Sequence, residues 1–317
     1  MGVAEFDLIA RIRARAATRG DVILGIGDDA ALLQPPAGMQ LVVAMDTLNS
    51  GVHFPPETAA ADIGWKALAV NLSDLAAMGA QPAWCTLSLS LPDADAGFVD
   101  GFVDGFLELA ERHGVALVGG DTTRGPLSVC VTVHGFVEPG TALRRAGARA
   151  GDEIWISGTV GDAAAALAQW RAGRGADAAL RSRLDRPIPR VALGRALRGI
   201  ASSCIDVSDG VLADLGHVCE ASGIGALLDV DALPGSEALR LALDVEPRRV
   251  LQATGGDDYE LCFTAPPETG EAIVRAAASA DVAVARIGRI IEGGDIATHA
   301  ADGGAWSAPG AGWIHFA

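Results

Sequence analysis

The feature that most constrains the fold is the alternation of short strand-like runs with longer helical patterns. After a first helix over residues 5–19, the spacing of apolar residues predicts strands over 41–44, 86–91, 115–118 and 127–137 and helices over 58–78 and 95–113. An apolar residue at every second position is typical of a half-buried strand, whereas spacings of three and four are typical of a helix. Strands that alternate with helices in this way predict an α/β protein.

The pattern lapses between Glu138 and Asp152, where Pro, Gly, Arg and Ala predominate. Beyond this segment the sequence predicts a strand over 153–157, helical segments to Gly199, a strand that ends at Asp206 and a helix over 209–222. We therefore expect a two-domain chain of α/β (α+β) type, with an N-terminal domain over 1–138 and a C-terminal α/β domain over 139–317.

The formal net charge of −16 restricts the partners that this protein can have. A surface of this sign repels nucleic acid and anionic membranes, so we expect neither as a partner. An enzyme of anionic nucleotides would need local cations, yet Lys66 is the only lysine. Because Lys66 also lacks the glycine spacing of a Walker-type loop, that lysine-based phosphate cradle is excluded.

The sequence indicates a cytoplasmic protein. Its apolar runs are short and interrupted, so none predicts a membrane span. Residues 1–19 mix charged and apolar residues at helical spacing, which favours an amphipathic helix over a signal peptide. The five cysteines are scattered and form no Cys-x-x-Cys pair, as expected for buried thiols in a reducing compartment.

Aspartates stand at recurrent places in the pattern. Apolar runs lead into Asp46, Asp121 and Asp206, with Asp209 close behind; Asp28 and Asp29 follow a glycine turn; and Asp74 lies near the end of the alanine-rich helix. Each has a structural explanation when taken singly, because an aspartate after a strand is commonly a turn residue or a helix cap. Asp209 could cap the following helix, and Asp28 could form the turn and leave Asp29 for chemistry.

Taken together, the aspartates favour a metal site. Ends of core strands tend to converge on one edge of a sheet, where α/β proteins bind ligands. Clustered carboxylates repel one another, and hard oxygen donors suit Mg²⁺, which binds through a few carboxylates and substrate phosphates. No His/Cys spacing favours zinc. Magnesium ions could replace the missing lysine cradle in phosphoryl transfer, which mainly needs alignment and charge neutralisation.

Five motifs in order resemble those of the thiamine-monophosphate kinase family, and the likeness runs from Glu5 to the C-terminal tail. They are residues 25–33 (GIGDDAALL), 66–80 (KALAVNLSDLAAMGA), 119–125 (GGDTTRG), 205–210 (IDVSDG) and 255–261 (GGDDYEL). The resemblance places the chain in the superfamily of aminoimidazole ribonucleotide synthetase. It implies an N-terminal domain of that type with a mixed sheet and helices, and a C-terminal α/β domain that completes the active-site cleft.

The resemblance also implies an activity. It is the Mg²⁺-dependent transfer of the γ-phosphoryl group of ATP to thiamine monophosphate, without a phosphoenzyme and without a required general base. The substrate phosphate is already largely ionised at neutral pH. The N-terminal domain is expected to bind ATP and metal and to form a homodimer with the sheet of a second subunit.

Site residues follow by position from the family motifs. The implied metal ligands are Asp29, Asp46, Asp74, Asp121, Asp206 and Asp209; the ATP contacts are Gly120, Asp121, Arg145 and Ser208; and the substrate contacts are His53, Asp257 and Trp313. Ala44 and Met45 replace a Ser/Thr pair that many relatives have, so Met45 could serve through its backbone carbonyl only. Asp257 stands where glutamate is frequent, which shortens the side chain by one methylene.

Two other interpretations remain open. The chain could be another ATP-using synthetase of the superfamily, such as a selenophosphate or aminoimidazole ribonucleotide synthetase. The absence of any cysteine before Cys85 argues against the first of these. It could also be a non-catalytic protein that binds nucleotide or divalent cations.

Overall fold

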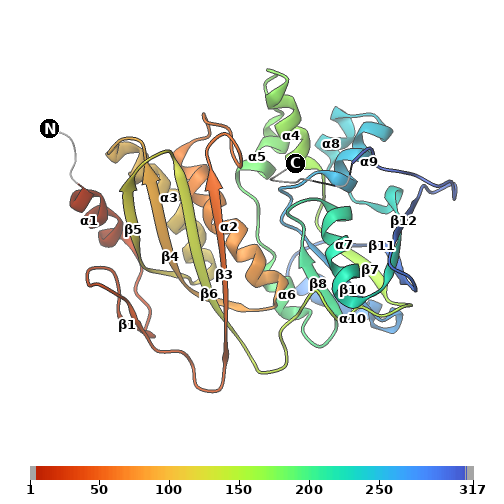
Figure 1. Cartoon of the computed structure of the whole chain (residues 1–317), viewed down its shortest axis with the longest axis horizontal. Helices are drawn as coiled ribbons and strands as arrows, with labels where there is room; N and C mark the ends of the chain where they lie inside the picture. The colour runs from red at the N-terminus through yellow and green to blue at the C-terminus, as the bar shows by residue number, and fades with distance from the viewer. Residues whose placement is uncertain (1–4, 311, 313–317) are drawn as a thin grey trace. The chain divides into compact units, whose positions relative to one another are not determined.

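The computed structural model describes residues 5–310 and 312. The chain divides into two compact units, residues 1–75 with 80–140 and residues 76–79 with 141–317. Figure 1 shows both units, each built from a sheet and helices. None of the helices in the described ranges is long and apolar enough to cross a membrane.

The first unit contains a mixed four-stranded sheet with the strand order β3-β6-β4-β5. Its elements are α1 (Glu5–Arg15), β1 (Val22–Leu24), β2 (Leu32–Leu33), β3 (Gln40–Asn49), α2 (Ala60–Ala77), β4 (Gln81–Leu91), α3 (Ala96–His113), β5 (Ala116–Arg124) and β6 (Ser128–Val137). Strands β4 and β5 are parallel, whereas β6 runs antiparallel to both β3 and β4.

Helices α2 and α3 lie on the same face of this sheet (Figure 1). Two glycines allow the helices to approach closely. A Cβ added at Gly64 would lie 2.0 Å from the carbonyl oxygen of Phe102, and one at Gly105 would lie 1.8 Å from that of Ala61. Larger side chains at these two positions would push the helices apart. In another part of the unit, Trp84 and Phe136 of the sheet pack with Val22 and Leu33 of the β1–β2 pair.

The second unit contains a six-stranded sheet with the order β12-β9-β11-β7-β10-β8. Its elements are β7 (Glu153–Ser157), α4 (Asp162–Arg171), α5 (Ala178–Asp185), α6 (Val191–Ala196), β8 (Ser203–Asp206), α7 (Val211–Ser222), β9 (Gly225–Asp229), α8 (Glu237–Ala242), α9 (Val245–Thr254), β10 (Leu261–Ala265), α10 (Gly270–Ser279), β11 (Val284–Ile291) and β12 (Ile296–His299). Within this sheet, β9 and β12 are the only described neighbours that run parallel. Helix α7 buries Val211, Leu215 and Val218 in the core that the sheet forms.

Most predicted elements are confirmed, but four differ in length. Strand β5 continues to Arg124, because residues 119–124 keep pairing with β4. Helix α1 ends at Arg15, and the side chain of Arg19 instead bonds to Asp21 through its Nε, 3.0 Å from Oδ1. Strand β3 continues to Asn49, because residues 45–49 keep pairing with β6. Strand β4 begins at Gln81, since an irregularity between Pro82 and Trp84 accommodates the proline, which cannot donate to the ladder.

Candidate active site

The strand-end argument is wrong for two of the aspartates. Asp46 lies within β3 and Asp121 lies within β5, and these strands are at opposite edges of the four-stranded sheet. Three inter-strand spacings of about 4.8 Å put roughly 14 Å between their backbones along the sheet. Within one chain, the positions of these two strands therefore do not bring the two carboxylates to a common ion.

The alanine-rich helix α2 fixes the neighbourhood of Asp46. Asn71, which is fully buried, accepts a hydrogen bond from the backbone N–H of Asp46 at 2.9 Å. Asp74 lies one turn further along α2, as predicted, and is half-buried. Lys66, on the same helix and 1% exposed, donates from Nζ to the carbonyl oxygen of His53 at 2.9 Å. The motif over 66–80 thus holds the segment that carries Asp46 and His53.

The His53 loop is also held by the imidazole itself. Its Nδ1 accepts from the backbone N–H of Asn49 at 3.0 Å, at the end of β3. This bond fixes the tautomer with the proton on Nε2. His53 is half-buried in the loop after β3, and Met45 on that strand is exposed.

Gly120, directly before Asp121, lets β5 approach β4. A Cβ added at Gly120, where φ is 154°, would lie 1.8 Å from the carbonyl oxygen of Leu87. A cavity of about 80 Å³ lies beside this segment and is lined by Ile9, Ile12, Ile26, Leu87, Leu117 and residues 119–122. Sequence reasoning missed the contribution of α1 to this cavity, although its amphipathic spacing was the available signal.

The loop that carries Asp28 and Asp29 has a cation beside it. The Oδ1 atom of Asp28 accepts from the backbone N–H of Asp29 at 2.9 Å, so Asp28 forms the turn. The guanidinium of Arg13 lies against Gly27, because a Cβ added there would be 2.4 Å from its Nη1. The sequence motifs did not indicate that Arg13 of α1 lies beside the loop of Asp28 and Asp29.

In the second unit, two distant motifs meet directly. The backbone N–H of Asp257 donates to the carbonyl oxygen of Ser208 at 2.9 Å, and that of Tyr259 donates to Val207 at 2.8 Å. The predicted residues Asp206, Ser208 and Asp209 therefore lie in one small region with Asp257. Gly312 lies beside the same loop, because a Cβ added there would be 2.7 Å from the Asp209 carbonyl oxygen. Trp313 lies outside the described residues.

Gly210 occupies the N-cap position of helix α7, and Asp214 in the first turn of the helix holds the loop that precedes it. The Oδ2 atom of Asp214 accepts from the backbone N–H groups of Ser208, Asp209 and Gly210 at 3.0, 3.0 and 3.1 Å. The capping explanation for Asp209 is therefore wrong. Burial, followed by the nearby Asp206 carboxylate, raises the pKa of Asp214 to about 7. Negative charge is concentrated at this end of β8, which is an environment that a hard cation would relieve.

Arg145 is exposed in the segment that follows the first unit. Ser222, at the end of α7, anchors this segment by accepting from the backbone N–H of Gly147 at 3.1 Å. A Cβ added at Gly147 would lie 2.3 Å from the Ser202 carbonyl oxygen, so the backbone passes close to the strand β8 region. The anchor leaves the guanidinium of Arg145 in solvent, where it can reach a phosphate.

Among the described side chains, no three His, Cys, Asp or Glu residues form a ready metal site. The donors near the predicted positions are carboxylates, which suit Mg²⁺ rather than a soft metal. Mg²⁺ commonly completes its shell with water and substrate phosphates, so a partial set of protein ligands fits this ion. The metal ligands inferred from the motifs stay a prediction.

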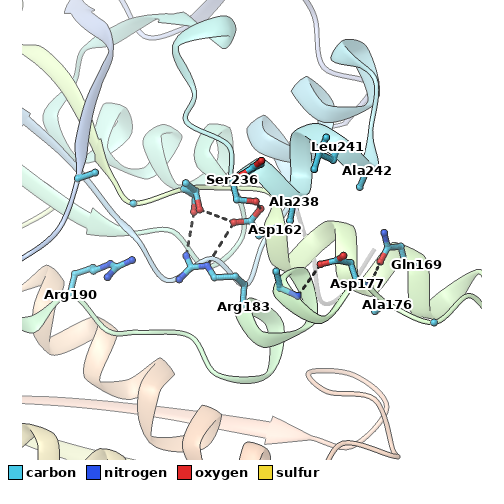
Figure 2. A pocket seen from close by; sticks show the side chains of 16 residues that line it. Asp162, Gln169, Ala176, Asp177, Arg183, Arg190, Ser236, Ala238, Leu241 and Ala242 are labelled. Carbon is cyan, nitrogen blue, oxygen red and sulfur yellow. Dashed lines mark hydrogen bonds and ion pairs between the residues drawn. The ribbon is translucent and has the colours of Figure 1, made fainter.

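A cavity of about 1050 Å³ in the second unit holds none of the predicted site residues. Figure 2 shows Asp162, Arg183 and Ser236 facing one another on its wall, with Arg190 nearby. Asp162 is 1% exposed and accepts from Ser236 Oγ at 2.6 Å and from Thr159 Oγ1 at 2.7 Å. These groups belong to a buried ionic cluster around Glu260.

Comparison with known proteins assigns the family. The model of the AIR synthase related protein N-terminal domain matches residues 27–137, and that of the C-terminal domain matches residues 149–300. Thiamine-monophosphate kinase of Escherichia coli K12 is 50% identical over 84% of this chain and 84% of its own length.

Two solved structures extend the likeness to the fold. Thiamine-monophosphate kinase from Stenotrophomonas maltophilia K279a is 57% identical, with a TM-score of 0.88 over 96% of this chain and 99% of that chain. AaThiL complexed with AMPPCP and TMP is 30% identical, with a TM-score of 0.78 over 89% of each chain. The chain therefore belongs to the thiamine-monophosphate kinase family, within the AIR synthase related proteins.

Proposed function

We propose that this protein transfers the γ-phosphoryl group of ATP to thiamine monophosphate and so forms thiamine diphosphate. The observation that carries the proposal is the 50% identity to a thiamine-monophosphate kinase over most of both chains. A relative with AMPPCP, an ATP analogue, and TMP bound supports the pair of substrates. The meeting of residues 206–209 with Asp257 is consistent with this pair.

Magnesium is part of the proposal. Asp29, Asp46, Asp74 and Asp121 of the first unit and Asp206 and Asp209 of the second would hold the ions, with the carbonyl oxygen of Met45 as a further donor. Bound Mg²⁺ would neutralise the phosphate oxygens and align the two reactants. Because Asp46 and Asp121 lie at opposite edges of the sheet, an ion shared between them would need a second subunit.

The protein's own residues position the anionic reactants. The close approach of β5 to β4 at Gly120 leaves backbone next to the cavity, where a nucleotide phosphate can approach N–H groups. Arg145 and Ser208 would contact ATP, and His53, Asp257 and Trp313 would contact the acceptor. The acceptor is a phosphate monoester whose attacking oxygen is ionised at neutral pH, so no side chain has to remove a proton.

We assign the domains accordingly. The N-terminal domain, residues 1–138, would bind ATP and metal and form a homodimer, and the C-terminal domain, residues 139–317, would complete the active site. Edge strand β3 supports the dimer, because Leu41, Val43 and Met45 on it are 49%, 54% and 62% exposed. Alternate apolar residues exposed on an edge strand are typical of a surface that another chain covers.

The test is a product assay with purified full-length protein, ATP and Mg²⁺. Thiamine monophosphate should give equal amounts of thiamine diphosphate and ADP, and excess EDTA should abolish both. Selenide and the acyclic precursor that an aminoimidazole ribonucleotide synthetase would cyclise serve as alternative acceptors. ADP formed only with another acceptor would contradict the proposal, and nucleotide binding without any turnover would indicate a non-catalytic protein.

A further inference from the structure

The segment that carries Asp257 has an unusual backbone. Asp257 and Tyr259 have φ angles of 69° and 51°, in the left-handed region that favours glycine. Side chains with a Cβ are strained there, and such conformations persist only when their surroundings enforce them. Strain of this kind commonly occurs where a side chain must be presented in one orientation.

The two carboxylates that alternate with these residues anchor the segment. Asp258 is 2% exposed and accepts from the backbone N–H of Gly161, with its Oδ2 at 2.8 Å. Glu260 is fully buried and accepts from Arg190 Nε at 2.6 Å and from Arg183 Nη2 at 2.7 Å. Figure 2 shows these two arginines on the cavity wall. Asp258 thus anchors the segment to the loop between β7 and α4, and Glu260 anchors it to α5 and to the loop between α5 and α6.

The backbone is tied on its other side to the loop after β8. The backbone N–H groups of Asp257 and Tyr259 donate to the carbonyl oxygens of Ser208 and Val207, respectively. The backbone N–H of Val207 in turn donates to the backbone carbonyl oxygen of Glu260 at 2.8 Å. A Cβ added at Gly256 would lie 2.3 Å from the Ser208 carbonyl oxygen, so the two segments are in close contact. The strained residues are therefore held by hydrogen bonds from both directions.

Tyr259 acts on Asp257 directly. Its hydroxyl donates to Asp257 Oδ1 at 3.1 Å, and its ring is buried, with 7% of the residue exposed. A packed ring has few rotamers, so this bond restricts the carboxylate of a half-buried side chain. Because the side chain of Asp257 is short, its carboxylate can reach fewer positions than that of a glutamate would.

We propose that Tyr259 is a positioning residue that orients the Asp257 carboxylate toward the acceptor substrate. The inference rests on the proposed function, in which Asp257 contacts thiamine monophosphate. A fixed carboxylate suits an acceptor whose ring system is cationic, because attraction between opposite charges strengthens when geometry is preorganised. Tyr259 acts through Asp257, so its effect falls on the acceptor and not on ATP.

The test is a double-mutant cycle in the full-length protein with Tyr259→Phe, Asp257→Asn and both changes together. Tyr259→Phe keeps the buried ring and should raise the KM for thiamine monophosphate about tenfold, with the KM for ATP unchanged within about twofold. In the Asp257→Asn background the same change should have no further effect, because the two residues act as one unit. Thermal unfolding of each variant checks that the fold is kept.

The outcomes separate the two ideas. A wild-type protein that forms no thiamine diphosphate overturns the proposed function. A wild-type protein that is active, with a Tyr259→Phe variant of unchanged KM, overturns only the positioning role. Equal increases in the KM of both substrates, or effects of the two changes that simply add, also contradict it.

Discussion

At the scale of single residues, the carboxylates have different structural roles, and their sequence context does not distinguish these roles. Asp28 forms a turn with Asp29, Asp214 holds the loop before α7, and Asp258 and Glu260 anchor a strained segment. The sequence predicted Asp209 as a possible cap because it precedes the helix. Gly210 is the N-cap residue instead, and the first-turn residue Asp214 bonds to the loop before the helix, which no local pattern distinguishes.

Loss of a carboxylate that is proposed to bind metal should sharply reduce turnover. Asp121→Ala or Asp74→Ala should lower kcat by about a thousandfold, because the charge of the transferring group is then less well neutralised. Steady-state kinetics at saturating Mg²⁺ measures the effect. Glu271→Gln, which removes a charge 93% exposed on α10, serves as the control. Wild-type rates in both Asp variants would refute their roles.

Glu260 should be a major contributor to the stability of the second unit. Glu260→Gln leaves Arg183 and Arg190 without their buried anion, so the free energy of unfolding should fall by about 3 kcal/mol. Urea unfolding followed by circular dichroism measures this change. The matched control is Glu153→Gln, whose partner Arg286 has a side chain 63% exposed, and which should cost less than about 1 kcal/mol.

The same residue implies a pH dependence of stability. Burial raises the pKa of Glu260, but Arg190 and Arg183 outweigh burial and hold the pKa below its ordinary value of 4.5. Because the folded pKa is the lower one, this stabilisation is complete above the unfolded value and is lost as pH falls through the folded pKa. Asp162 and Asp258 face the same cluster. Unfolding of Glu260→Gln should therefore depend less on pH below about 4.5 than that of the wild type.

At the scale of elements, the helices and strands were largely predictable because their apolar spacing is regular. Helices α2 and α3 and strand β6 lie within a few residues of their predicted bounds. The predicted end of β3 was wrong because strands were predicted from the spacing of apolar residues. Polar residues at the end of this exposed edge strand interrupt that spacing. The position of Asp46 within a strand follows from pairing with β6, which is information from another part of the chain.

Two neighbouring glycines of β5 should respond very differently to a methyl group. Gly120→Ala places a Cβ 1.8 Å from a backbone oxygen of β4, so the strand must move. We expect the free energy of unfolding to fall by about 3 kcal/mol and ATP binding to be lost. Gly119→Ala meets no atom within 4 Å and should change stability by less than about 1 kcal/mol. Thermal unfolding and ATP titration distinguish them. Equal effects would contradict the close approach of the strands.

The exposed edge of β3 should govern the oligomeric state. Val43→Lys places a charge within the proposed subunit interface and should convert a dimer into a monomer. Val274→Lys on α10 is the control, since Val274 is similarly exposed at 56%. Light scattering after size exclusion gives the mass. A wild-type monomer, or a Val43→Lys dimer, would refute the interface.

At the scale of the whole molecule, the net charge of −16 and the single lysine make the supply of cations the central question. Each unit has an arginine that is a candidate to contact phosphate: Arg13 lies against Gly27 in the first unit, and Arg145 is exposed in the second. The motifs identified the family from sequence alone, whereas the site residues that they imply stay a prediction. Contacts such as Tyr259 with Asp257 depend on a left-handed backbone and could not be predicted from spacing.

The most direct test is a crystal structure of the protein with Mn²⁺, a non-hydrolysable ATP analogue and thiamine monophosphate. Anomalous scattering locates Mn²⁺, which accepts the oxygen ligands that Mg²⁺ accepts. The account predicts anomalous peaks about 2.1 Å from carboxylate oxygens of the predicted set, between the two phosphate groups. Both ligands bound in the crystal with no metal beside any of Asp29, Asp46, Asp74, Asp121, Asp206 and Asp209 would contradict it.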